Sequence, residues 1–199
     1  MDDFLGNSIF KNQSITFSKA YDSRADQWVN ITAQVETFAR ERPRAYHGVI
    51  FVENNIYILG GFDGQNYFNT VRRLDLNTFE CLEEPPMNHR RCYISSCVLD
   101  GHIYVMGGMD GHTRLRAAER YSLADRQWEL IADMNEKRSD ASSCSDEVLG
   151  RVYCAGGFNG QECLFTAEFY CPLNKIWTQV TPMRSRRSGV SIISTGKMV

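Results

Sequence analysis

The stretch IYVMGGMDG at residues 103–111 decides the fold, because close copies of it occur on both sides: IYILGGFDG at 56–64 and VYCAGGFNG at 152–160. The glycine pairs are 47 and 49 residues apart. Each copy has a short apolar run, two glycines, then Phe or Met, an Asp or Asn, and a further glycine. A period of this length indicates an array of repeated structural units, such as propeller blades.

Further residues keep fixed distances from the first glycine of each pair. Tyr recurs fourteen residues after it, Trp twenty-one and Arg thirty-one, although one unit has Leu74 and Cys81 in place of the rings. Glycine permits backbone conformations closed to other residues, large rings bury area between sheets, and Arg can donate to loop carbonyls. The repeated structural positions are Gly60, Gly61, Gly107, Gly108, Gly156 and Gly157, Tyr21, Trp28, Tyr121, Trp128, Tyr170 and Trp177, and Arg44, Arg91, Arg138 and Arg187.

The unit 91–132 shows how one repeat folds. Its β-rich segments predict strands over Tyr93–Leu99, His102–Met106, Ala117–Tyr121 and Gln127–Ile131, with a hairpin signal at Asp100-Gly101. No window keeps a helical period for two turns. Four strands in about 47 residues predict an all-β fold of four-stranded antiparallel propeller blades.

The sequence resembles the kelch-repeat family, in which a BTB-BACK region commonly precedes the propeller. The resemblance rests on the glycine pairs, on AERY separated by six residues from a Trp (residues 118–128), and on Met-x3-Arg at 134–138. Because kelch-like propellers have six blades, it implies an incomplete ring, expected to be unstable alone or oligomeric. The expected division is a non-repeat segment 1–13, then a partial propeller over 14–199 with whole blades at about 44–84, 91–132 and 138–180 and partial ones at 14–33 and 187–199.

The resemblance also implies a function. Such propellers commonly capture the protein substrate of a cullin-3 ubiquitin ligase, while BTB and BACK regions bind cullin-3, and nothing in these 199 residues resembles those regions. The capturing surface is formed by residues after the repeat Arg and in the loop after the glycine pair. The expected partner-binding residues are Tyr46, Phe62, Tyr67, Cys92, Tyr93, Met109, Arg114, Ser139, Phe158, Cys163 and Ser188. Several of the aromatics have the alternative role of packing the loops themselves.

Composition excludes other classes of function. The chain has 22 Lys and Arg against 24 Asp and Glu, which argues against a nucleic-acid or anionic-membrane binder. The glycine loops match neither common nucleotide-binding motif. The seven Cys and four His show no metal-binding spacing, so we expect no metal, no cofactor and no catalytic residues.

The N-terminus lacks a secretory signal, which favours a cytoplasmic protein with reduced thiols. An actin-binding kelch module and, less favoured, a propeller enzyme are the alternatives.

Overall fold

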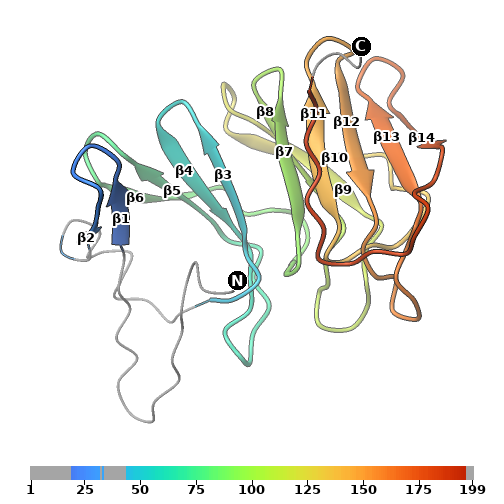
Figure 1. Cartoon of the computed structure of the whole chain (residues 1–199), viewed down its shortest axis with the longest axis horizontal. Helices are drawn as coiled ribbons and strands as arrows, with labels where there is room; N and C mark the ends of the chain where they lie inside the picture. Colours follow the sequence, from blue (N-terminus) through green and yellow to red (C-terminus); the bar gives the residue numbers. More distant parts are fainter. Residues whose placement is uncertain (1–18, 32, 34–43, 196–199) are drawn as a thin grey trace.

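The computed structural model describes residues 19–31, 33 and 44–195, and no described residue lies in a helix. Three four-stranded antiparallel sheets stand side by side in a fan, and the chain also forms a two-stranded hairpin (Figure 1). The sheets do not close into a ring. The strands are β1 Lys19–Asp22, β2 Gln27–Asn30, β3 Gly48–Val52, β4 Asn55–Leu59, β5 Val71–Asp75, β6 Cys81–Glu84, β7 Ser95–Leu99, β8 His102–Met106, β9 Ala118–Ser122, β10 Gln127–Ile131, β11 Ser142–Asp146, β12 Arg151–Ala155, β13 Ala167–Cys171 and β14 Ile176–Val180.

Each sheet is one repeat, and its strands pair in chain order as a blade. The prediction of all-β, four-stranded antiparallel blades is therefore confirmed. The turn between β7 and β8 consists of Asp100 and Gly101, both with positive φ (46° and 66°), as a tight hairpin requires. Between β11 and β12 the turn has four residues, 147–150, and this longer turn accommodates the two extra residues of the third repeat.

Two apolar cores lie between successive blades. In the first, Ile50, Tyr57 and Leu59 of blade β3–β6 pack against Ile103 and Tyr121 of blade β7–β10. Alternation of side chains along a strand gives each blade two apolar faces, so burial is complete only where a blade has a neighbour on each side. The second core joins blade β7–β10 to blade β11–β14 and contains Cys97, Leu99, Tyr104, Met106, Ala118, Met134, Val152, Cys154, Tyr170 and Trp177.

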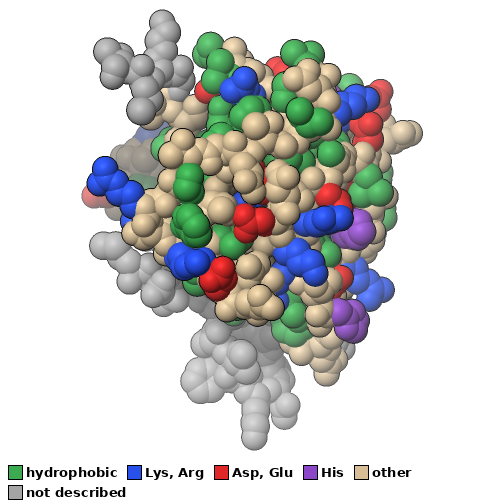
Figure 2. Space-filling view, turned by 90° about the vertical axis from the view of Figure 1, so that its right-hand side faces the viewer, with side chains coloured by type: hydrophobic (Ala, Val, Ile, Leu, Met, Phe, Trp, Pro, Cys, Tyr) green, Lys and Arg blue, Asp and Glu red, His purple; other side chains and the backbone are tan. Residues whose placement is uncertain are grey.

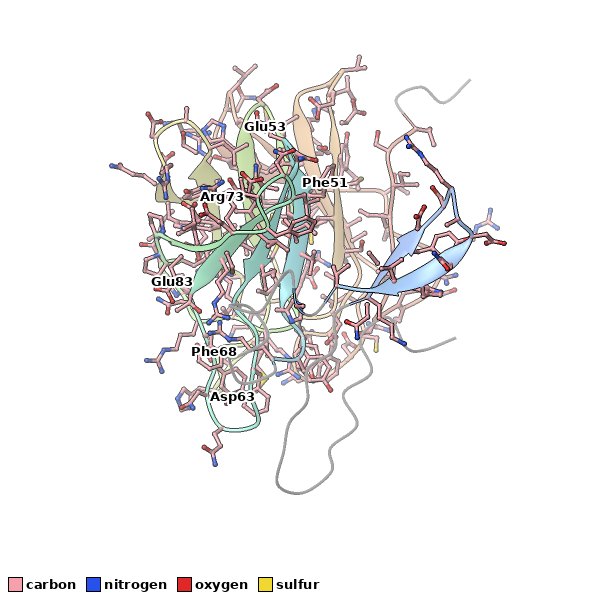
Figure 3. The ribbon with its side chains drawn as sticks, turned by 90° about the vertical axis from the view of Figure 1, so that its left-hand side faces the viewer. Phe51, Glu53, Asp63, Phe68, Arg73 and Glu83 are labelled. Atoms are coloured by element: carbon pink, nitrogen blue, oxygen red, sulfur yellow. The ribbon has the colours of Figure 1, made fainter. Side chains whose placement is uncertain are left out.

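The repeated rings pack at these interfaces in two of the three units that contain them. Tyr121 and Tyr170 are 0% and 2% exposed, and Trp177 is 9% exposed. In hairpin β1–β2, however, Tyr21 and Trp28 are 50% and 57% exposed, so the expected burial of these two rings is not found. The hairpin stands apart from blade β3–β6 in Figure 3, and all eight of its strand residues are exposed.

The expected first strand of a further blade, within 187–199, does not form in its described part, 187–195. This segment nevertheless follows the edge of blade β11–β14: Gly157 N donates to Arg187 O over 2.7 Å, and Ile192 N donates to Ser142 Oγ over 3.1 Å. A strand needs a ladder of backbone bonds to a neighbouring strand, and residues 187–195 make only isolated bonds to blade β11–β14 and its loops. The predicted N-terminal segment 1–13 and the start of the partial blade predicted over 14–33 lie outside the described residues. No helix that could cross a membrane occurs in the described part of the chain.

Candidate protein-binding face

The loops that follow the glycine pairs emerge together at one end of the blades. In Figure 3, Asp63 of the loop between β4 and β5 lies at this end, and Glu53 of the β3–β4 turn lies at the other. We call this end the loop face, and define it as residues 44–47, 60–70, 91–94, 107–117, 138–141, 156–166 and 187–189.

The first glycine of each pair is needed because the next repeat passes close to it. A Cβ on Gly60, Gly107 or Gly156 would lie 2.3, 2.2 or 2.7 Å from the carbonyl oxygen of the next repeat's Arg, and all three glycines have positive φ. The second glycine donates its N–H to the same oxygen; for example, Gly108 N lies 2.7 Å from Arg138 O. The glycine pair thus joins each blade to the next, and does not form a nucleotide-binding loop.

The repeat Arg is a buried clamp in two blades. Arg91, with a side chain 0% exposed, donates to the Gly107 and Ala117 carbonyls over 2.6 and 2.8 Å and to Glu119 Oε1 over 2.9–3.0 Å. Burial lowers the pKa of Arg91, and the Glu119 carboxylate opposes that change. Arg138 bonds Gly156, Thr166 and Glu168 in the same manner.

The carboxylate partners of this clamp were missed in the sequence analysis. A recurrent Glu two residues before the repeat Tyr, at 119 and 168, was the available signal. Blade β3–β6 has Arg72 at that position, and its Arg44 instead lies over the Phe68 ring, 3.8 Å from the centroid. Arg187 is exposed, in contrast to the buried role that its position in the repeat suggests.

Each unit brings three of the positions expected at a partner surface into contact. The residue after the glycine pair forms single β-bridges both to the residue after the repeat Arg and to the residue five positions further on. These triplets are Ala45, Phe62 and Tyr67; Cys92, Met109 and Arg114; and Ser139, Phe158 and Cys163.

The acidic or amide residue of the loop motif shapes the loop. Asp110 Oδ1 accepts the backbone N–H groups of His112 and Thr113 over 2.8 and 2.9 Å. Asp63 and Asn159 accept the equivalent pairs in their own loops. Such turns hold the loop in one shape without help from a ligand.

Side chains at the last position of the first two triplets reach the next unit. A Cβ on Gly111 would meet the Tyr67 ring at 2.8 Å, so Tyr67 lies directly over that glycine. The Arg114 guanidinium lies 5.4 Å from the centroid of the Phe158 ring and also contacts the Met109 sulfur. The loop face is therefore continuous across blades.

A line of residues with positive φ also crosses the blades on this face. Tyr93 N donates to Tyr46 O over 2.8 Å, Asp140 N to Tyr93 O over 3.2 Å, and Gly189 N to Asp140 O over 2.9 Å. Burial raises the pKa of Asp140, against the lowering effects of the Ser139 hydroxyl and the Arg114 charge.

Exposure divides the expected partner-binding residues into two groups. Cys92 and Ser139 are 1% and 0% exposed, so these two are not surface contacts, and this part of the prediction needs correction. Each is held inside by its β-bridge to the loop residue after the glycine pair, and burial raises the pKa of the Cys92 thiol to about 11. The residues that remain accessible are Tyr46, Phe62, Tyr67, Tyr93, Met109, Arg114, Phe158, Cys163 and Ser188.

No group of three or more His, Cys, Asp or Glu side chains that could hold a metal occurs among residues 19–31, 33 and 44–195. The accessible part of the loop face instead offers aromatic rings, Met and Arg on loops fixed by backbone bonds. These side chains are typical of protein–protein contacts.

Comparison with known proteins agrees with this architecture. A model of the KLHDC2/KLHL20/DRC7 Kelch-repeats domain matches residues 11–199. The Kelch repeat-containing protein kel-10 of Caenorhabditis elegans is 36% identical over 81 residues, which are 39% of this chain and 13% of the relative. The Kelch repeat and BTB domain-containing protein F47D12.7 of the same organism is 38% identical over 78 residues, 38% of this chain and 13% of the relative.

The matched stretches thus span about an eighth of the length of these two relatives. The family model, in contrast, covers nearly all of the chain, including every described blade. Repeat spacing, blade topology and family match agree, and the chain belongs to the kelch-repeat family, whose propellers are protein-interaction domains.

Proposed function

We propose that this chain is a non-enzymatic, substrate-capturing kelch module of a cullin-3 ubiquitin ligase, and that it holds its protein partner on the loop face. The observation that carries the proposal is the continuity of that face. Within a unit, β-bridges join the residue after the glycine pair to the residue after the repeat Arg and to the residue five positions further on. Residues of this surface also contact the next unit through backbone hydrogen bonds and through the Arg114 side chain.

The accessible surface divides into two chemically different regions. Around Tyr46 it is aromatic: Phe62 and Tyr67 have ring centroids 4.5 Å apart, and the Tyr93 ring stacks on Tyr46. Around Arg114 it carries charge as well as apolar groups: the guanidinium contacts the Met109 sulfur and lies near the Phe158 ring, with Asp140 nearby. An aromatic anchor beside an Arg suits a folded or extended protein segment that has one apolar and one acidic side chain.

The ligase assignment rests on the family. One of the relatives is, by its name, a Kelch repeat and BTB domain-containing protein. In this division of labour the BTB and BACK regions bind cullin-3 and the propeller binds the substrate. We accordingly propose that these 199 residues bind substrate but not cullin-3, and that they act in the cytoplasm.

The test compares three variants of the immobilised chain by quantitative mass spectrometry of captured cellular proteins. Tyr46→Ala and Arg114→Ala alter the two regions of the loop face. Leu173→Ala is the control, because Leu173 lies in the β13–β14 turn, outside the loop face, with its side chain 92% exposed. Substrates are proteins that wild type and Leu173→Ala retain, that both face variants lose, and whose turnover slows when cullin-3 is depleted. An unchanged set across all variants, or direct binding of purified cullin-3 to the chain, contradicts the proposal. Co-sedimentation with actin filaments that both face variants abolish would replace it with the cytoskeletal function.

A further inference from the structure

Asn159 and Gly160 form the one Asn-Gly step in the sequence, and they lie in the loop between β12 and β13. This loop projects from the lower end of blade β11–β14 in Figure 1. The other two repeats have Asp63 and Asp110 at the position of Asn159. An Asn that precedes Gly can react with its own backbone, because Gly has no side chain to hinder the approach to its nitrogen.

Two backbone N–H groups fix the orientation of the Asn159 side chain. Asn159 Oδ1 accepts hydrogen bonds from Gln161 N over 2.8 Å and from Glu162 N over 3.0 Å. Only the oxygen of a carboxamide can accept two such donors, so Nδ2 takes the other position. Nδ2 has no hydrogen-bond partner within the described part of the chain. The carboxamide is therefore folded over the Gly160 peptide, and its NH2 group is held by no other residue.

The same two N–H groups are placed to stabilise attack on this carboxamide. When a nucleophile adds to Asn159 Cγ, negative charge gathers on Oδ1, and donors that already point at that oxygen stabilise the charge, as in an oxyanion hole. The nucleophile is the Gly160 nitrogen. Its N–H has no hydrogen-bond partner among residues 19–31, 33 and 44–195, so the attack breaks no hydrogen bond of that group.

Access to the glycine distinguishes this loop from the equivalent loop of the preceding blade. A Cβ on Gly111 would meet the Tyr67 ring at 2.8 Å, whereas a Cβ on Gly160 would have only Arg114 Cγ nearby, at 3.8 Å. Gly160 is also exposed, while Asn159 is half-buried. Water can therefore reach the Asn-Gly step.

We propose that Asn159 is a site of spontaneous deamidation in the folded protein. The Gly160 nitrogen forms a bond to Asn159 Cγ and gives up its proton to water, the Cγ–Nδ2 bond breaks, and Nδ2 leaves as ammonia. The product of this step is a five-membered succinimide ring. One water molecule then opens the ring, either at Cγ to give aspartate or at the main-chain carbonyl of residue 159 to give isoaspartate.

The two products should affect the loop differently. Aspartate suits it, because Asp63 and Asp110 accept the equivalent pairs of N–H groups in their own loops. Its effect is an added negative charge beside Phe158 of the loop face, at an end of the molecule where acidic and basic side chains are interspersed (Figure 2). Isoaspartate instead adds a backbone carbon inside the loop that the Phe158–Cys163 bridge closes, and should break that bridge.

The test follows the full 199-residue chain at neutral pH and body temperature by peptide mapping, with digestion at mildly acidic pH and electron-transfer fragmentation to separate aspartate from isoaspartate. Asn159 should deamidate at least about tenfold faster than Asn174, which is exposed in the β13–β14 turn but precedes Lys175. Gly160→Ala should slow the reaction by at least about tenfold, because its Cβ hinders the attacking nitrogen. The rate should rise with pH, since the Gly160 amide must lose its proton.

Comparison with the unfolded chain separates the contribution of the structure from that of the sequence. Because the N–H donors on Oδ1 exist only in the folded loop, the folded chain should react at least as fast as the chain in guanidinium chloride. Asn159→Asp serves as the reference product and should unfold at the same denaturant concentration as wild type, with circular dichroism as the check on folding. A rate at Asn159 no higher than at Asn174, a slower reaction in the folded chain, or a clearly less stable Asn159→Asp would each overturn the proposal.

Discussion

The rings of Tyr46 and Tyr93, equivalent residues of successive repeats, stack with centroids 4.1 Å apart and planes inclined by 27°. The Tyr93 N–H also donates to the Tyr46 carbonyl over 2.8 Å. The same pair therefore joins two blades by a backbone hydrogen bond and forms an aromatic platform on the loop face.

Replacing either tyrosine tests whether this platform stabilises the blade pair. We expect Tyr46→Ala to lower the free energy of unfolding by about 1 kcal/mol, through loss of the ring contact. Tyr46→Phe should cost less, because it retains the ring. Urea unfolding of Tyr46→Ala, Tyr93→Ala and the double variant measures the coupling directly, and strictly additive losses would contradict a stabilising contact.

Arg138 and Arg187 occupy the same position of the repeat but should differ in their importance. Removing Arg138 leaves the Glu168 carboxylate buried and unpaired, so Arg138→Ala should cost about 3–5 kcal/mol. The side chain of Arg187 is exposed, and Arg187→Ala should change stability by less than about 0.5 kcal/mol. Equal losses in thermal or urea unfolding would show that the buried ion pair does not produce the difference.

Gly107 and Gly101 allow steric contact to be separated from backbone strain. Both have similar positive φ, 63° and 66°, but a Cβ would meet Arg138 O at 2.2 Å from Gly107 and nothing within 4 Å from Gly101. Gly101→Ala should therefore cost about 1–2 kcal/mol, the penalty for the left-handed conformation alone. Gly107→Ala should cost clearly more, because it also forces two blades apart. Chemical denaturation of both variants provides the comparison, and similar losses would count against close blade contact.

Glu84 should make stability depend on pH. Burial raises its pKa, but hydrogen bonds from Tyr121, Arg73 and Arg126 outweigh burial, so the pKa of Glu84 lies below its ordinary value. A lowered pKa in the folded state stabilises the protein above the unfolded pKa, about 4.3, and this contribution is lost as pH falls through the folded value.

Glu84→Gln should accordingly destabilise the chain at pH 7, and its difference from wild type should shrink below about pH 4. Unfolding measured at intervals from pH 7 to pH 3 tests this. Glu83→Gln, which removes the same charge from the neighbouring exposed position, is the matched control. A difference between Glu84→Gln and wild type that stays constant with pH would mean that the carboxylate charge is not involved.

Repeat spacing predicted the blades because it reflects contacts within a unit. The second and fourth strands of the middle blade, His102–Met106 and Gln127–Ile131, were predicted with the bounds that the structure shows. The loop positions that meet in each triplet were expected at the partner surface from the resemblance to the kelch family, and they recur because the chain path inside a blade is the same in every repeat.

Which residues are buried between units could not be predicted from the sequence and was decided by the tertiary structure. Arg138 and Arg187 cannot be distinguished by spacing, and neither can Trp177 and Trp28, yet one of each pair is buried and the other is exposed. A sequence motif specifies how a residue sits within its own blade, because that depends on local backbone geometry. Whether the residue is buried depends on the blade beside it, and only the three-dimensional arrangement shows where a neighbouring blade stands.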